Sequence, residues 1–219
     1  MQFSGGLLSP VLAWACVVAA ALLLVLALGG LPALRAGPSR IHLLLGAAVG
    51  LAVLWSVNAG IDPGLRVHVL GMTVVVLLLG WRLGVLAGAL AEISLVAYGV
   101  TPLMAAAAAW LVCAAIPGAV TLGIAWTARF YLPRNPFVFI FVCGFFGAGL
   151  AVLATWLTGA ALLALSGQPS PSGAGASLTA FLPLMLFPEA FINGALVSML
   201  IVYRPEWLRL YDEAFYARG

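Results

Sequence analysis

Long apolar runs, interrupted by few charged residues, constrain this chain more than any other feature. Hydrophobic residues make up 65% of its 219 residues and charged residues only 7%, whereas a typical soluble domain carries about 25% charged residues. A helix that crosses a bilayer needs about 20 mainly apolar residues. Seven stretches qualify, the shorter ones marginally: 7–31, 41–58, 67–80, 83–99, 102–128, 137–165 and 178–203. The sequence therefore predicts an all-α integral membrane protein, a polytopic bundle of about seven transmembrane helices.

All nine basic residues are arginines, and they are distributed unevenly between the two sides of this predicted bundle. Arg66 lies on the side of the N-terminus, and the other eight lie on the opposite side. Cytoplasmic loops are enriched in Arg and Lys. We therefore expect a multi-pass protein of the cell (inner) membrane with its N-terminus outside and its C-terminus inside. The eight are Arg35, Arg40, Arg82, Arg129, Arg134, Arg204, Arg209 and Arg218.

The chain is expected to form a transmembrane bundle over residues 1–203 and a cytoplasmic tail over residues 204–219. Four large apolar residues of the tail fall on one helical face: Trp207, Leu208, Tyr211 and Phe215. This pattern predicts an amphipathic helix that lies on the membrane surface, in contact with lipid, or docks on a partner.

Small residues within the apolar runs predict where helices pack closely. Gly46 with Gly50, and Gly84 with Gly88, form GxxxG patterns, which are typical of close contacts between membrane helices. Pro117 predicts a kink in the stretch 102–128, because proline cannot donate a backbone hydrogen bond.

Several classes of function are excluded by residue types and patterns that the chain lacks. Without lysine there can be no Walker A motif, so the chain cannot hydrolyse ATP by that route. No serine–histidine pair, HExxH motif or carboxylate dyad occurs with usable spacing, so no enzyme is predicted. Cys16, Cys113 and Cys143 lie far apart within apolar runs, which is typical of small buried side chains rather than of a disulfide framework or a zinc site. The arginines are confined to a few loops, so no nucleic-acid partner is predicted.

Two carboxylates fall in the middle of predicted spans, where an ionisable group is costly and often functional. Glu92 lies within 83–99 and Glu189 within 178–203, with Asn193 one helical turn after Glu189. We expect these three residues to form a polar network in the core. The network is either a purely structural set of hydrogen bonds or an element that couples conformational changes.

A candidate metal site is predicted at the outer start of the stretch 67–80. His68 lies there, on the same side as the N-terminus and Asp62, and Met72 follows one turn deeper on the same helical face. Imidazole and thioether groups suit a soft ion such as copper(I). The alternatives are a histidine bonded to a loop carbonyl and a methionine that only packs. His42, beside Arg40, is expected to be an interfacial histidine.

The segment His68-Val-Leu-Gly-Met-Thr73, followed by Leu-Leu-Leu-Gly-Trp81, resembles the substrate-binding membrane subunits of CbiM/NikM type from energy-coupling-factor transporters. The segment Pro188-Glu-Ala-Phe-Ile-Asn-Gly194 resembles their last helix. The resemblance implies uptake of cobalt or nickel, with a transmembrane coupling subunit and ATPase subunits on other chains.

The resemblance also implies metal ligands from the amine of Met1, from residue two and from His68. Residue two is Gln2, where the family typically has histidine. A carboxamide oxygen is a poorer ligand for nickel than imidazole, so this departure predicts a weaker site or a different metal.

Two functions remain open from the sequence. The first is a substrate-capture subunit for a transition-metal cation, cobalt or nickel or copper, bound in a shallow outer pocket. The second is a non-transporting accessory or assembly protein that keeps the scaffold but has lost the metal site. The pocket would be formed by Met1, Gln2, Asp62, His68 and Met72.

Overall fold

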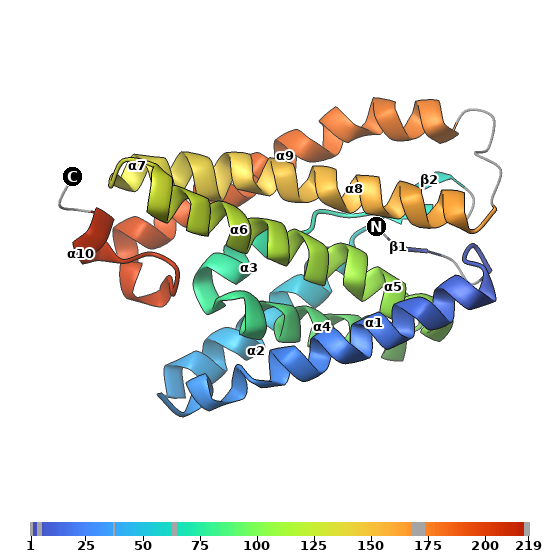
Figure 1. Ribbon diagram of the computed structural model, residues 1–219, viewed down its shortest axis with the longest axis horizontal. Coiled ribbons are helices and arrows are strands. Elements are labelled where there is room, and N and C mark those ends of the chain that lie inside the picture. Colours follow the sequence, from blue (N-terminus) through green and yellow to red (C-terminus); the bar gives the residue numbers. More distant parts are fainter. Residues whose placement is uncertain (1, 4–5, 37, 63–64, 168–173, 217–219) are drawn as a thin grey trace.

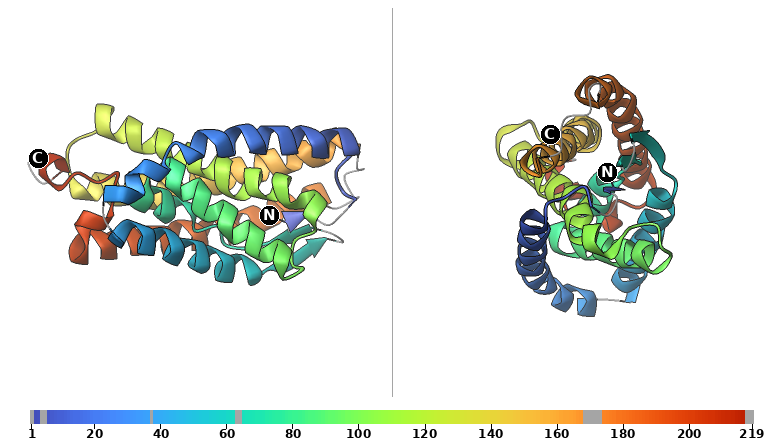
Figure 2. Two further views of the ribbon diagram at one scale, coloured as in Figure 1. Left: turned by 90° about the horizontal axis from the view of Figure 1, so that it is seen from below. Right: turned by 90° about the vertical axis from the view of Figure 1, so that its right-hand side faces the viewer.

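A computed structural model describes residues 2–3, 6–36, 38–62, 65–167 and 174–216 of the chain. The helices form an elongated bundle (Figure 1, Figure 2). A small sheet lies toward one end, which we call the sheet end, and the C-terminal segment lies at the other, which we call the tail end.

The described residues are mainly helical. The longest helices are α1 (Pro10–Leu28), α2 (Pro38–Ser56), α4 (Trp81–Ala97), α6 (Ile116–Tyr131), α8 (Gly147–Leu165) and α9 (Ala174–Tyr203). Shorter helices are α3 (Met72–Leu79), α5 (Leu103–Trp110), α7 (Pro136–Val138) and α10 (Glu213–Tyr216). π-Helical turns at Leu111–Ala115 and Phe139–Phe146 join α5 to α6 and α7 to α8, and 3-10 turns occupy Leu31–Ala36 and Pro205–Trp207.

Within the described residues, five helical stretches are long and apolar enough to cross a membrane. They are Pro10–Arg35, Ser39–Ser56, Leu103–Tyr131, Pro136–Leu165 and Phe181–Tyr203. Large apolar side chains such as Trp14, Leu22 and Phe187 are exposed on these helices. Such a surface suits a bilayer and not water. The chain is therefore a multi-pass membrane protein, whereas the predicted count of seven crossings stays a prediction.

The region predicted as a continuous span over 67–80 is shorter and less regular than expected. Its first residue ends strand β3 (Leu65–Val67), and helix α3 begins only at Met72. An eight-residue helix is about 12 Å long, less than half the thickness of a hydrocarbon core. This helix lies inside the bundle, where it contacts α2, α4, α6, α8 and α9.

Glycines with positive φ delimit helix α3. Gly71 precedes it with φ 67°, and Gly80 follows it with φ 78°, a backbone region that residues with a Cβ rarely adopt. The chain can therefore turn sharply at both ends of this helix. After Gly80 the chain enters α4, and Gly84 of α4 packs against Val76 of α3.

One of the two predicted GxxxG contacts is confirmed and the other is wrong. A Cβ on Gly88 would lie only 2.6 Å from the Cβ of Ala114, so the helices meet closely there. A Cβ on Gly46 or Gly50 would meet no atom within 4 Å. The face of α2 that carries these two glycines is open, so spacing alone does not predict a contact.

Two further expectations concern Pro117 and the tail. A π-helical turn at Leu111–Ala115 ends two residues before Pro117, so the helix is irregular close to the predicted kink. The tail, in contrast, is not one amphipathic helix. Its described residues form a 3-10 turn and the short helix α10, separated by an irregular segment.

We expect Gly88→Ala to destabilise the protein by about 1–3 kcal/mol, because the added methyl group overlaps Ala114. The matched control is Gly50→Ala, where the methyl group meets open space. That change should leave stability equal or raise it by about 0.5–1 kcal/mol through helix propensity. Thermal unfolding in detergent measures both, and equal melting temperatures for the two variants would contradict the packing described.

Candidate metal site at the sheet end

A three-stranded sheet places the N-terminal strand beside the residues that lead to His68. Strand β1 (Gln2–Phe3) pairs antiparallel with β3, and β3 also pairs with β2 (Ala59–Asp62). The register sets Gln2 opposite Arg66, two residues before His68. Phe3 is buried in the core and so fixes the strand. Met1 and the side chains of Gln2 and Asp62 lie outside the described part of the structure.

His68 is buried in the loop of residues 68–71 that joins β3 to α3, hereafter the His68 loop. Its Nδ1 lies 3.1 Å from the carbonyl oxygen of Val69, and its Nε2 lies 3.7 Å from Sγ of Cys113. In the tautomer in which Nδ1–H donates to Val69, Nε2 carries the lone pair that can ligate a metal. The ring also packs at 5.4 Å, between centroids, from the indole of Trp55.

A small enclosed cavity of about 10 Å³ adjoins the imidazole. This volume is about the minimum that one water molecule or a single ion needs. Glu189 and Met185 of α9 and Thr155 of α8 share the cavity with His68. The apolar part of the lining consists of Val67, Leu70, Val152 and Trp156.

The carboxylate of Glu189 holds the His68 loop. Its Oε2 accepts the backbone N–H of Leu70 at 2.6 Å, and its Oε1 accepts that of Gly71 at 2.7 Å. Asn193, one turn later on α9, donates from Nδ2 to the same Oε1 at 2.8 Å. The Oδ1 of Asn193 accepts the N–H of Val74 at 2.9 Å, which lies in the first turn of α3, where amides lack helical acceptors.

A further bond fixes the same loop from the opposite side. The indole Nε1 of Trp55 donates to the carbonyl oxygen of Leu70 at 2.8 Å. Both backbone groups of Leu70 are therefore satisfied by side chains of other helices. The loop has no regular secondary structure, yet α2 and α9 fix its course.

The predicted core network is thus only partly assembled. Glu189 and Asn193 are brought together, but Glu92 shares no hydrogen bond with them within the described residues. Glu92 lies on α4 in the wall of an apolar groove between α1, α4 and α5. Its Oε1 and the hydroxyl of Thr101 are both buried, and Thr101 is the neighbour that can donate to this carboxylate. The place of Glu92 in the network therefore stays a prediction, because it projects from α4 whereas Glu189 and Asn193 project from α9.

Two sulfur-containing side chains lie beside His68, those of Met185 and Cys113. Met72 is fully buried, with its sulfur beside Gly88, which is the position of a packing side chain. Met185 lines the cavity at His68. Cys113, expected to be only a small buried side chain, lies next to Nε2 of His68. No sequence signal indicated this neighbour, because it comes from a helix distant along the chain.

No group of three or more His, Cys, Asp or Glu side chains arranged to hold a metal occurs among the residues the structure describes. His42 is exposed on α2 and shares a groove with Trp207 near the tail end, as expected for an interfacial histidine.

We expect Glu189→Leu to lower the stability strongly, because the buried N–H groups of Leu70 and Gly71 would lose their acceptors at about 1–3 kcal/mol each. Glu189→Gln keeps one acceptor oxygen and should fall between wild type and the leucine variant. Glu206→Gln is the control, since Glu206 is exposed. Thermal unfolding in detergent compares the three. A leucine variant that melts with the wild type would contradict the assigned hydrogen bonds.

Comparisons with known proteins agree with this architecture. Residues 3–207 match a protein family described as CbiM, cobalt uptake substrate-specific transmembrane region. Two solved structures have similar folds, each at 20% sequence identity. One, described as a transition metal transporter, has a TM-score of 0.79, with 100% of both chains covered. The other, described as a truncated transition metal transporter, has a TM-score of 0.77, with 93% of this chain and 99% of the other covered.

A search of curated proteins finds no significant match. The likeness to the two solved structures concerns the fold. The family match, in contrast, covers nearly the whole sequence and includes the His68 loop, α3 and the Glu189 segment. The chain therefore belongs to the CbiM family of cobalt uptake transmembrane regions, which is a family of transport proteins and not of enzymes.

Proposed function

We propose that the chain is the substrate-capture subunit of an energy-coupling-factor-type transporter for a transition-metal cation. Cobalt and nickel are the first candidates, and copper is the third. The observation that carries the proposal is the pairing of β1 with β3, which sets residue two beside the strand that leads to His68. ATPase subunits and a transmembrane coupling subunit on other chains supply the energy, since this chain has no lysine for a Walker A motif.

His68 is the proposed first ligand, through Nε2. Imidazole nitrogen is a good ligand for cobalt, nickel and copper, and the bond from Nδ1 to Val69 orients the ring. A metal ion at Nε2 would lie next to the sulfur of Cys113. The N-terminal residues Met1 and Gln2 provide the remaining ligands, and Asp62 and Met72 are less directly placed neighbours.

The burial of His68 requires a way in for the metal. We propose that β1 is this gate, because it consists of two residues and is held by a short pairing with β3. Opening β1 exposes the His68 loop, while Glu189 and Asn193 keep the loop in its binding conformation. The carboxylate and amide are thus positioning residues for the metal site.

A second function is favoured by one specific feature, the glutamine at position two. The chain would then be an accessory or assembly protein with the same scaffold and no metal transport. Metal analysis of the purified protein distinguishes the two functions, since only the capture subunit binds a metal.

We further propose that the tail end faces the cytoplasm of the inner membrane, with residues 204–219 as a cytoplasmic tail. Three arginines support this orientation: Arg82 donates to the carbonyl oxygen of Gly29, Arg129 pairs with Asp212, and Arg209 lies against Gly80. Arg66, in contrast, lies in the sheet. An excess of arginine marks cytoplasmic loops.

A reporter that is active only in the cytoplasm, fused after Gly219, should be active because the arginine-rich end is retained inside. A reporter that is active only outside the cytoplasm should be active when it is inserted in the loop between α8 and α9. An inactive cytoplasmic reporter after Gly219, together with an active periplasmic reporter at the same position, would contradict the orientation.

We expect His68→Ala to remove binding of nickel and cobalt, and Gln2→His to raise the affinity by about tenfold or more, since imidazole replaces a carboxamide. Isothermal titration with each metal chloride, on protein with a native N-terminus, measures the affinities. His42→Ala is the matched control because His42 is exposed near the tail end. If wild type and Gln2→His both bind no metal, the accessory function takes the place of the proposed one.

A further inference from the structure

The C-terminal segment 204–216 packs back onto the tail end of the bundle. Leu208, Tyr211 and Tyr216 are buried, and the rings of Tyr211 and Tyr216 stack at 5.3 Å between centroids. Phe139 meets both rings edge-on, at 5.1 and 5.2 Å. Burial raises the pKa of Tyr216 to about 12, so this phenol stays neutral in its packed position at physiological pH.

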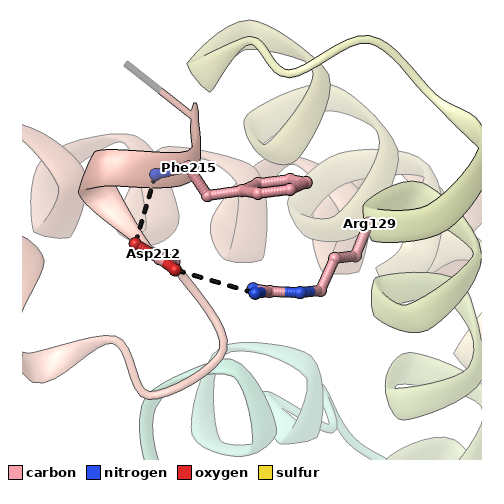
Figure 3. A network of polar contacts seen from close by, with 3 residues as sticks. All are labelled: Arg129, Asp212 and Phe215. Atoms are coloured by element: carbon pink, nitrogen blue, oxygen red, sulfur yellow. Dashed lines mark hydrogen bonds and ion pairs between the residues drawn. The ribbon is translucent and has the colours of Figure 1, made fainter. Parts of the chain in front are cut away.

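Two arginines hold the segment from the side, Arg129 in the last turn of α6 and Arg134 in the loop that follows. Arg129 pairs with the Asp212 carboxylate at 3.6 Å, and Asp212 accepts the backbone N–H of Phe215 at 3.2 Å (Figure 3). The guanidinium groups of Arg129 and Arg134 lie 4.6 and 4.7 Å from the centroid of the Phe215 ring. The segment is therefore docked by apolar, ionic and cation–π contacts together.

The docked segment bonds directly to the end of α3. The backbone N–H groups of Arg209 and Leu210 donate to the carbonyl oxygens of Leu78 and Leu77, each at 3.1 Å. The side chain of Arg209 donates to the carbonyl oxygen of Leu79 at 3.4 Å. The last carbonyl groups of a helix have no intrahelical donors, so the C-terminal segment provides the cap that α3 lacks.

The opposite end of the same helix carries the His68 loop. There Glu189 and Asn193 accept from Leu70, Gly71 and Val74. Helix α3 has only about two turns, and six of its eight residues are buried. Close-packed interiors transmit strain, and α3 connects the C-terminal segment to the His68 loop through a continuous buried helix.

We propose that residues 208–210 are positioning residues for the metal site, acting through α3. Contact between the C-terminal segment and α3 sets the position of the His68 loop, so an event at the tail end changes metal affinity at the sheet end. Arg209 also lines an open groove of about 780 Å³ with Arg129, Glu206 and Asp212, which makes the contact reachable by another protein. The metal part of the proposal rests on the proposed function, whereas the structural part does not.

The test removes one backbone donor. Leu210→Pro eliminates the N–H that bonds to Leu77, and Leu210→Ala keeps it as the matched control. The exchange rates of single backbone amides are measured by hydrogen–deuterium exchange, with fragmentation to single residues, on the full chain in detergent. We expect the amides of Leu70, Gly71 and Val74 to exchange at least about tenfold faster in the proline variant. In the alanine variant, which keeps the N–H, they should exchange clearly more slowly than in the proline variant, and helix α1 should be unchanged in both.

Faster exchange confined to residues 77–81 and 204–216 would overturn the proposal, because the segment would then be only a local cap. Faster exchange in α1 as well would mean general loosening and would also count against it. If the proline variant does not fold, Leu208→Ala decides by the same criteria, since it removes a buried anchor of the segment.

A nickel titration of the same variants tests the metal part. The proline variant should bind nickel at least about fivefold more weakly than Leu210→Ala, although neither change touches the sheet end. Unchanged nickel affinity alongside faster exchange at Leu70 would overturn the link to the metal site. If no variant and no wild-type protein binds nickel or cobalt, the proposed function fails, and exchange at Leu70, Gly71 and Val74 still decides the structural part.

Discussion

The carboxylate of Glu189 is the acceptor on which the centre of this bundle depends. Residues 68–71 form neither strand nor helix, so regular secondary structure cannot satisfy their amides. At membrane depth such a backbone is tolerated only where protein groups take the place of water. Glu189 provides this for Leu70 and Gly71, and Asn193 fixes its orientation. This ionisable residue, costly in an apolar helix, satisfies the amides of an irregular loop that has no other acceptor for them in regular secondary structure.

Most of the long helices could be predicted, because an apolar run of bilayer length has few alternatives to a helix. The predicted stretches 137–165 and 178–203 agree with helices found at Pro136–Leu165 and Phe181–Tyr203. The composition of the stretch 67–80 does not show where its strand ends and where helix α3 begins. The stretch is apolar apart from His68 and Thr73, and its irregular beginning depends on an acceptor that lies 119 residues further along the chain. The strands, two to four residues long, are too short to show a period-two pattern.

The polar residues of the site were predictable individually and not as a constellation. The cost of a charge in hydrocarbon singled out Glu189, and i, i+4 spacing brought in Asn193 on the same face. The same cost singled out Glu92, which proved to lie in a different wall of the bundle. Cys113 carried no such cost and was overlooked, although its sulfur is 3.7 Å from His68. The free-energy cost of a buried charge shows which residues must have a special environment, but it does not predict which of these residues contact one another.

The π-helical turn at Leu111–Ala115 has a consequence for how relatives are aligned. A π turn holds one more residue than an α turn, and one residue of an α-helix corresponds to a rotation of about 100°. Cys113 lies within this turn, whereas Thr121, which contacts Thr73, comes after it. A one-residue gap placed in 111–115 would thus change which side chain faces His68 without shifting Thr121. The number of residues in that turn, and not only the identity of residue 113, therefore decides which side chain faces His68.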